Sequence, residues 1–124
     1  MSNSNNAYLA MRIQSVILEE YRKEVEGKPK ATLKFFVRDK VVQKVYPKDE
    51  FVYSGGSMVQ EFPNDGMSKA TRKVFFKLIE NCLHNYKKID YATVLISYEL
   101  NADRDDFEDF RINIENEKHF TYIS

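Results

Sequence analysis

The feature that most constrains the fold of this chain is a change in the spacing of its apolar residues, which occurs twice. Over residues 6–25, apolar side chains recur at steps of three and four, the spacing that gathers them on one side of an α-helix. Over residues 31–46 they alternate with polar side chains, the spacing of a β-strand with one buried face. The same change separates residues 69–88 from residues 91–100. The sequence therefore predicts two amphipathic helices combined with a sheet.

The first helix is expected over residues 6–25, after a frayed tail at residues 1–5. Asn5 or Asn6 can cap its start, and Gly27 followed by Pro29 provides the stop. Charged residues fill its polar side. The residues on its apolar side are Leu9, Ile13, Val16, Ile17 and Tyr21.

Four strands are expected between the two helices. In the first, Leu33, Phe35 and Val37 would face the core, and a tight connection at Asp39 and Lys40 would lead to a second strand over Val41–Tyr46. The segments EFVYS and SMVQEF are typical of two short strands, because the glycine pair between them suits a two-residue hairpin turn. A phosphate-binding loop is disfavoured here, since the pair stands well before the next helix and no GKS or GKT follows.

The second helix is expected over Lys69–Lys88, with Ser68 as its N-cap and Gly66 as a turn residue before it. Cys82 is expected in the core, because free cysteines are usually buried. The predicted apolar stripe consists of Val74, Phe75, Leu78, Ile79, Cys82 and Tyr86, with Phe76 and Leu83 widening it.

Two long strands should follow this helix. Residues 91–100 alternate clearly, with Val94, Ile96, Tyr98 and Leu100 on one face. The acidic segment NADRDD is expected to turn the chain into a strand over residues 107–116. Residues 118–124 would form a last edge strand or a docked extension.

These patterns predict a single α+β domain spanning residues 1–124. The expected order is α-β-β-β-β-α-β-β, with an antiparallel sheet of about five to six strands and two helices packed on one face. A chain of 124 residues with 43% apolar content is long enough to bury one continuous core.

Composition argues against several classes of function. A single cysteine excludes a disulfide framework and a multi-cysteine zinc site. Cys82 and His84 stand two positions apart on the predicted helix and so point in nearly opposite directions, and His119 lies far along the chain. We therefore expect no catalytic residues, no metal and no cofactor, and we predict that the protein is not an enzyme.

The N-terminus has no signal-peptide pattern, and no apolar run is long enough to span a bilayer. We accordingly expect a cytoplasmic protein with no membrane partner.

The formal net charge of zero conceals an uneven distribution. From Asp90 to Glu117 there are nine acidic and two basic residues. Clustered carboxylates attract a basic partner, so the acidic turn is the predicted contact with another protein, and an aromatic residue within it would serve as an apolar anchor. A solvated β-turn is the alternative. The predicted partner-binding residues are Asp103, Asp105, Asp106, Phe107, Glu108 and Asp109.

A nucleic-acid-binding surface is the alternative prediction. Aromatic and basic residues that share an open sheet face can stack bases and contact phosphates. The segment GMSKATRK also resembles the basic start of the second helix in the double-stranded-RNA-binding domain, although Ala70 and Thr71 follow its lysine and two further strands come after the helix. The residues of this alternative are Lys34, Phe36, Arg38, Lys44, Lys69, Arg72 and Lys73, with Tyr46 beside Lys44 on the same sheet face.

Over residues 8–116 the organisation resembles that of the YezG-like bacterial immunity proteins. The resemblance rests on an N-terminal helix, the tyrosine-bearing segment EFVYS, the helix segment FPNDGMSKATRKVFFKLIENCL and the aromatic-rich return FEDFRINI. Tyr91 stands near the position where that family often has tryptophan. The resemblance implies a cytosolic antitoxin that neutralises a basic nuclease toxin. A phage-encoded inhibitor of a host enzyme would have the same features.

Overall fold

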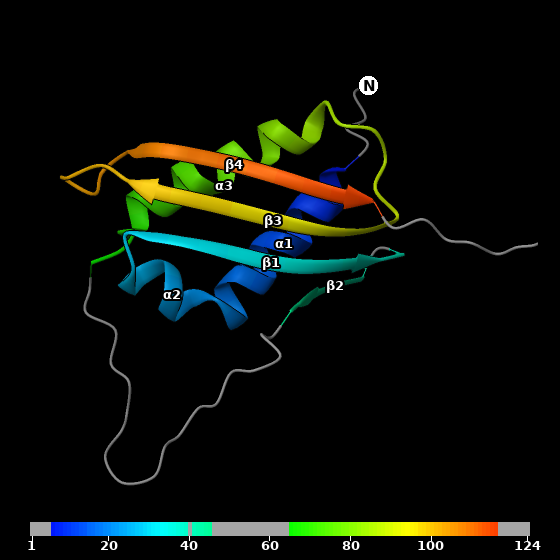
Figure 1. Ribbon diagram of the computed structural model, residues 1–124, viewed down its shortest axis with the longest axis horizontal. Coiled ribbons are helices and arrows are strands. Elements are labelled where there is room, and N and C mark those ends of the chain that lie inside the picture. Colours follow the sequence, from blue (N-terminus) through cyan, green and yellow to red (C-terminus); the bar gives the residue numbers. More distant parts are fainter. Residues whose placement is uncertain (1–5, 40, 46–64, 117–124) are drawn as a thin grey trace, which may run out of the picture.

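The computed structural model describes residues 6–39, 41–45 and 65–116 of the chain. Three helices cover one face of a four-stranded antiparallel sheet in this part of the molecule (Figure 1). The strands are β1 (Lys30–Arg38), β2 (Val41–Lys44), β3 (Tyr91–Leu100) and β4 (Phe107–Asn116), and their order in the sheet is β2-β1-β3-β4. The predicted α+β class with an antiparallel sheet is confirmed. The strands expected within residues 50–62 and 118–124 lie outside the described residues, so the described sheet is smaller than the five to six strands predicted.

The first predicted helix is divided in two, which accounts for three helices where two were expected. Helix α1 (Ala7–Glu20) ends at Tyr21, and α2 (Arg22–Gly27) follows directly. The Tyr21 hydroxyl donates to the Lys34 carbonyl at 2.8 Å, and its ring meets Phe35 edge-on at 5.3 Å. The bend thus brings the end of α1 onto β1.

Helix α3 (Lys69–His84) ends four residues earlier than predicted, and another residue binds the backbone at and just after its end. The side-chain amide of Asn6 donates to the carbonyls of Leu83, Tyr86 and Lys87 at 2.9–3.2 Å, and its oxygen accepts from the N–H of Ile89 at 3.2 Å. Asn6 stands at the N-cap position of α1 but makes no side-chain bond to that helix. The expected capping role is therefore wrong for Asn6, whereas Ser68 caps α3 as predicted.

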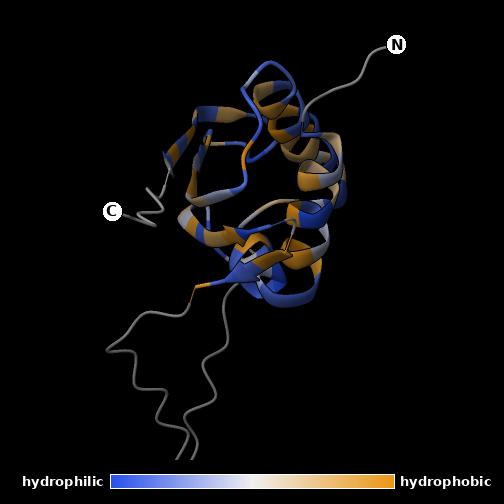
Figure 2. Ribbon diagram, turned by 90° about the vertical axis from the view of Figure 1, so that its right-hand side faces the viewer, coloured by the Kyte–Doolittle hydropathy of each residue, from blue (hydrophilic) through white to orange (hydrophobic). Residues whose placement is uncertain are grey.

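The core lies between the helices and one face of the sheet. The buried positions predicted on α1 and on β1 and β3 are confirmed. Figure 2 shows hydrophobic and hydrophilic residues alternating along the ribbons, as expected for elements that bury one face. The prediction for α3 needs correction, because the side of the helix that faces the core is rotated by about one residue position from the predicted apolar stripe. The core members from α3 are Thr71, Phe75, Ile79 and Leu83.

Two residues predicted in the α3 core are exposed. Val74 retains 43% of its accessible surface, and Cys82 is also exposed. The cause is Phe75, whose ring stacks on Phe107 at 5.8 Å and meets Tyr98 edge-on at 5.4 Å. This aromatic contact fixes the rotation of the helix and turns its neighbours outward.

Candidate functional site

One end of the molecule brings charged side chains of both signs together. There α2, the start of α3 and the turn between β3 and β4 surround an open hollow of about 570 Å³. Carboxylates from the predicted acidic set line it together with cations from the predicted basic set, namely Asp103 and Asp105 with Lys69 and Arg72. The sequence placed these groups in alternative functions, but the fold brings them side by side.

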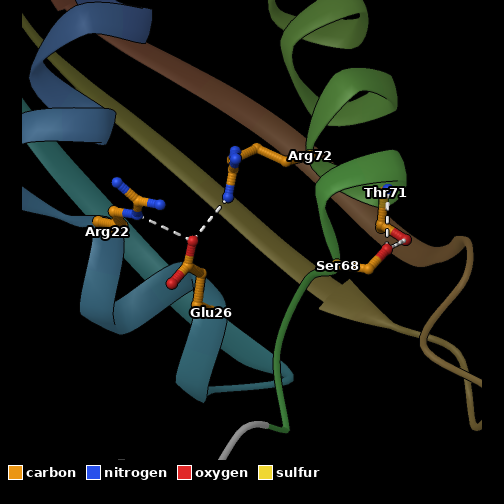
Figure 3. A network of polar contacts seen from close by, with 5 residues as sticks. All are labelled: Arg22, Glu26, Ser68, Thr71 and Arg72. Carbon is orange, nitrogen blue, oxygen red and sulfur yellow. Dashed lines mark hydrogen bonds and ion pairs between the residues drawn. The ribbon is translucent and has the colours of Figure 1, made fainter.

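The start of α3 is tied to this turn by hydrogen bonds. The Ser68 hydroxyl accepts from the backbone N–H of Thr71 at 3.1 Å, which caps the helix (Figure 3). The Thr71 hydroxyl then donates to the carbonyl of Arg104 at 3.1 Å. Thr71 is 2% exposed, so this bond holds the turn against α3 from a buried position.

The arginines beside the hollow have acidic partners outside the turn. Arg72 donates to Glu26 at 2.7 Å, and Arg22 reaches the same carboxylate at 3.0 Å (Figure 3). Arg104 pairs with Asp65 at 3.1 Å. Because these guanidinium groups are engaged elsewhere, they leave the carboxylates of the turn only partly compensated.

The turn itself has a defined conformation. The N–H of Asn101 donates to the carbonyl of Asp106 at 3.0 Å, and the N–H of Arg104 donates back to the carbonyl of Asn101 at 3.0 Å. The Asn101 side chain also bonds to Asp105 twice, through its amide at 2.9 Å and its oxygen at 3.1 Å. Arg104 adopts a left-handed backbone conformation with φ of 61°. The backbone that carries the carboxylates is therefore fixed by its own contacts.

The predicted partner-binding residues differ in their surroundings. Within the part of the chain that the structure describes, Asp103 and Glu108 make no ion pair, whereas Asp109 pairs with Arg111 at 3.0 Å. Asp106 accepts from the N–H of Phe107 at 2.8 Å. The exposed carboxylates are those of Asp103, Asp105, Asp106 and Glu108.

The predicted apolar anchor, Phe107, lies half-buried rather than at the surface of the turn. Its ring packs with Phe75 and approaches Tyr98 and Phe110 at 6.3–6.4 Å. The Tyr98 hydroxyl donates to the carbonyls of Glu24 and Lys28 at 3.3 and 2.9 Å, and burial, with a smaller contribution from the charge of Glu24, raises the pKa of Tyr98. Phe107 therefore joins the acidic turn to the core.

The face of the sheet opposite the helices carries the alternative set only in part. Lys34, Phe36 and Arg38 of β1 lie on this face, opposite Leu95, Thr93 and Tyr91 of β3. Phe36 and Tyr91 are half-buried, and Lys34 and Arg38 are exposed. We call the face formed by these side chains of β1 and β3 the open sheet face. It combines aromatic rings with cations, as predicted.

Lys44 does not belong to the open sheet face, contrary to prediction. It pairs with Phe35, a core residue, so its side chain points toward the helices. There its ammonium group lies 4.6 Å from the centre of the Tyr21 ring and donates to the carbonyl of Glu20 at 3.2 Å. Tyr46, which was expected beside it, lies outside the described residues.

The α3 residues of the alternative set lie on the opposite side of the molecule from the open sheet face. Lys69 and Lys73 are exposed on α3, and Arg72 is held by Glu26. The predicted basic residues therefore do not form one continuous surface.

Two of the three residues considered for catalysis, Cys82 and His84, lie in the part of the chain that the structure describes. His84 is exposed at the end of α3, and His119 lies outside the described residues. Partial burial of its sulfur raises the pKa of the Cys82 thiol, even though the residue as a whole is exposed. Across residues 6–39, 41–45 and 65–116, no three side chains of the kinds that bind metals come together.

A second open hollow, of about 560 Å³, lies between α1 and α3. Gln14 crosses it to Glu80 at 2.9 Å, and Asn6 and His84 also line it.

None of the helices in the described part of the chain has the length and apolar character needed to cross a membrane.

No protein-family model, curated protein or solved structure matches this chain. Its function must therefore be argued from the surfaces just described.

Proposed function

We propose that this chain is a non-catalytic domain that binds another protein through its acidic turn, in the manner of an immunity protein or a phage-type inhibitor. The observation that carries the proposal is the combination of a fixed turn with exposed carboxylates. Over residues 101–109 there are five carboxylates and one guanidinium, and that guanidinium pairs with Asp65. Charges carried on a backbone that is fixed before binding lose less conformational entropy when a partner arrives, which favours tight and selective contacts.

A basic target suits such a surface. Carboxylates form short charge-assisted hydrogen bonds with arginine and lysine, and they accelerate association with a positively charged partner. Nuclease active sites and substrate channels are positively charged, so a nuclease toxin or a host enzyme acting on nucleic acid is the proposed class of partner. The resemblance to YezG-like immunity proteins supports the same class and a cytoplasmic location.

The experiment uses the tagged chain to capture its partner from the native cell at moderate salt, with and without nuclease treatment, followed by titration of the identified partner. The test variant combines Asp103→Asn, Asp105→Asn and Glu108→Gln. A control variant with the same change in charge combines Glu19→Gln, Asp39→Asn and Asp90→Asn, which lie away from the turn. We expect the test variant to bind the partner at least about ten-fold more weakly, with little change in melting temperature.

The control variant should bind like the wild type. Equal affinity of all three proteins would remove the acidic turn as the interface. Capture of RNA or DNA that disappears on nuclease treatment would instead favour the function considered next.

A second candidate function, binding of single-stranded nucleic acid, is favoured by the open sheet face. Phe36 and Tyr91 provide rings for base stacking, and Lys34 and Arg38 stand beside them to contact phosphates. The measurement is fluorescence anisotropy of a labelled single-stranded RNA at several salt concentrations. Replacing both cations with alanine should weaken binding and reduce the salt dependence by roughly 0.7 in slope per lost phosphate contact.

The matched control replaces Lys77 and Lys87, which are exposed on and after α3. Binding that is insensitive to salt, or equally weakened by both variants, would exclude specific recognition by the open sheet face.

A further inference from the structure

Strand β4 forms one edge of the sheet (Figure 1). Its ten residues pair with β3 on one side, and no strand among the described residues pairs with the other side. An unpaired edge of this length presents a row of backbone N–H and C=O groups, which are a template for another strand. The opposite edge, β2, has only four residues and is a much shorter template.

Within the described part of the chain, the core is less deeply buried along this edge. The helix-facing side chains of β4 are only partly buried, whereas Val94 and Ile96, their neighbours on β3, are 0% exposed. Apolar side chains at a sheet edge gain burial when a further strand extends the sheet over the same helix layer. The partly buried side chains are Phe110, Ile112 and Ile114.

Helix α3 carries an apolar stripe beside the same edge. Val74, Leu78 and Cys82 recur at four-residue steps and therefore lie along one side of the helix. That side is roughly opposite Glu80 and His84, which line the hollow shared with α1. Because α3 lies behind β3 and β4, with α1 on its other side, the stripe faces the outer edge of β4 (Figure 1).

We propose that the occupant of this edge is a second copy of the chain, with β4 pairing antiparallel to β4 of the copy about a two-fold axis at Asn113. In this register Arg111 of each copy lies opposite Glu115 of the other, and Ile112 lies opposite Ile114. Residues directly opposite in an antiparallel pair share a face, so both charge pairs lie on the face away from the helices and both isoleucine pairs face the core. The two α3 stripes would flank the seam.

The charge pattern of β4 favours this register over those whose axis lies earlier in the strand. An axis one residue earlier would set Asp109 opposite Glu115 twice, and an axis two residues earlier would set Arg111 opposite its own copy. Like charges directly opposite one another are destabilising. An axis three residues earlier would set Glu108 opposite Ile112. In an isologous two-fold interface the same residues of both copies meet, so their charges must complement one another in the register that forms.

The test exchanges the two charges. In Arg111→Glu, each copy would place glutamate opposite Glu115, and in Glu115→Arg each would place arginine opposite Arg111. Each variant alone should therefore dimerise at least about ten-fold more weakly than the wild type. An equimolar mixture restores both opposite-charge pairs and should form a heterodimer, with affinity close to that of the wild type. Sedimentation-velocity ultracentrifugation over a concentration series measures all four samples.

The control variant Arg38→Glu changes the same charge on β1, away from the edge, and should leave dimerisation unchanged. Thermal melting of each variant confirms that it folds. A wild-type chain that stays monomeric up to millimolar concentration would overturn the proposal. So would a dimer that both charge variants leave intact, or a mixture that does not recover association.

A covalent measurement checks the axis independently. In a Cys82→Ser background, Asn113→Cys places each new thiol opposite its own copy, where opposed Cβ atoms are about 4.5–5.5 Å apart. Mild oxidation should yield a covalent dimer, whereas Lys34→Cys in the same background, also exposed but on β1, should not. Equal cross-linking of the two variants would contradict the proposed axis. This outcome is independent of whether the acidic turn binds a partner.

Discussion

The most quantitative expectation concerns Asn6, whose side chain joins the start of α1 to the end of α3. Asn6 is 3% exposed and forms four hydrogen bonds to the backbone of residues 83–89. The bonds to Leu83 and Ile89 are buried, and those to Tyr86 and Lys87 are part-buried. A buried backbone group left without a partner costs about 1–3 kcal/mol. We therefore expect Asn6→Ala to lower the free energy of unfolding by about 2–4 kcal/mol.

Urea denaturation followed by circular dichroism measures this loss as a lower midpoint with an unchanged m-value. For a domain of this size, each kcal/mol corresponds to a fall in melting temperature of about 4 °C, so the midpoint should fall by roughly 10 °C. Asn6→Asp should be no better than Asn6→Ala at neutral pH, because it keeps the acceptor for Ile89 but turns a carboxylate toward three carbonyls.

The matched control is Gln14→Ala, also on α1 and also bonded to α3, but through an exposed contact with Glu80. It should cost less than about 0.5 kcal/mol. A cost below about 1 kcal/mol for Asn6→Ala would refute the reasoning, since water would then replace the side chain at little expense.

Three further changes have defined expectations. Ser68→Ala removes the cap of α3 and should cost about 1 kcal/mol in urea denaturation. Gly66→Ala would drive a Cβ into the carbonyl oxygen of Val25, so the backbone must move, and we expect a loss of about 1–3 kcal/mol by the same assay. Because the pKa of Tyr98 is raised in the folded state, the contribution of its hydroxyl to stability is fully present below pH 10, the ordinary tyrosine pKa. That contribution should fall as pH rises above this value. Tyr98→Phe should be less stable at neutral pH but lose less stability between pH 9 and 11; an equal alkaline loss in both proteins would argue against this role.

The sequence predicted the elements well where one periodic pattern covered many residues. The buried faces of α1, β1 and β3 follow directly from the spacing of apolar side chains. The spacing did not predict the bend at Tyr21, because the bend depends on a hydrogen bond to Lys34 in β1. The rotation of α3 likewise depends on the contacts of Phe75 with rings from two strands. Local spacing carries no information about such tertiary contacts.

The same limit applies to the binding surfaces. The sequence identified the acidic turn and its carboxylates, but it did not indicate that α2 and the start of α3 would lie beside them. Lys44 was placed on the wrong face because the register of a short strand depends on its turn, which here includes Asp39 with φ of 48°. The sequence marked Asn6 as the start of a helix, but an asparagine in that position ordinarily predicts a cap and not hydrogen bonds to another helix.

The order of strands has a consequence for how the chain is made. Strand β1 lies in the interior of the sheet, yet its partner β3 follows it by roughly 50–70 positions, so their pairing closes a long loop and should slow folding. On the ribosome, Leu33, Phe35 and Val37 emerge well before the strand that will pair beside them. Among the described elements, α1, α2, β2 and α3 all precede β3 in the chain and can shield these side chains before β3 is made, but none of them pairs with the β1 edge that β3 will occupy. The nascent chain therefore passes through a stage in which an interior strand of the sheet has an edge that awaits its partner, and such an edge favours aggregation.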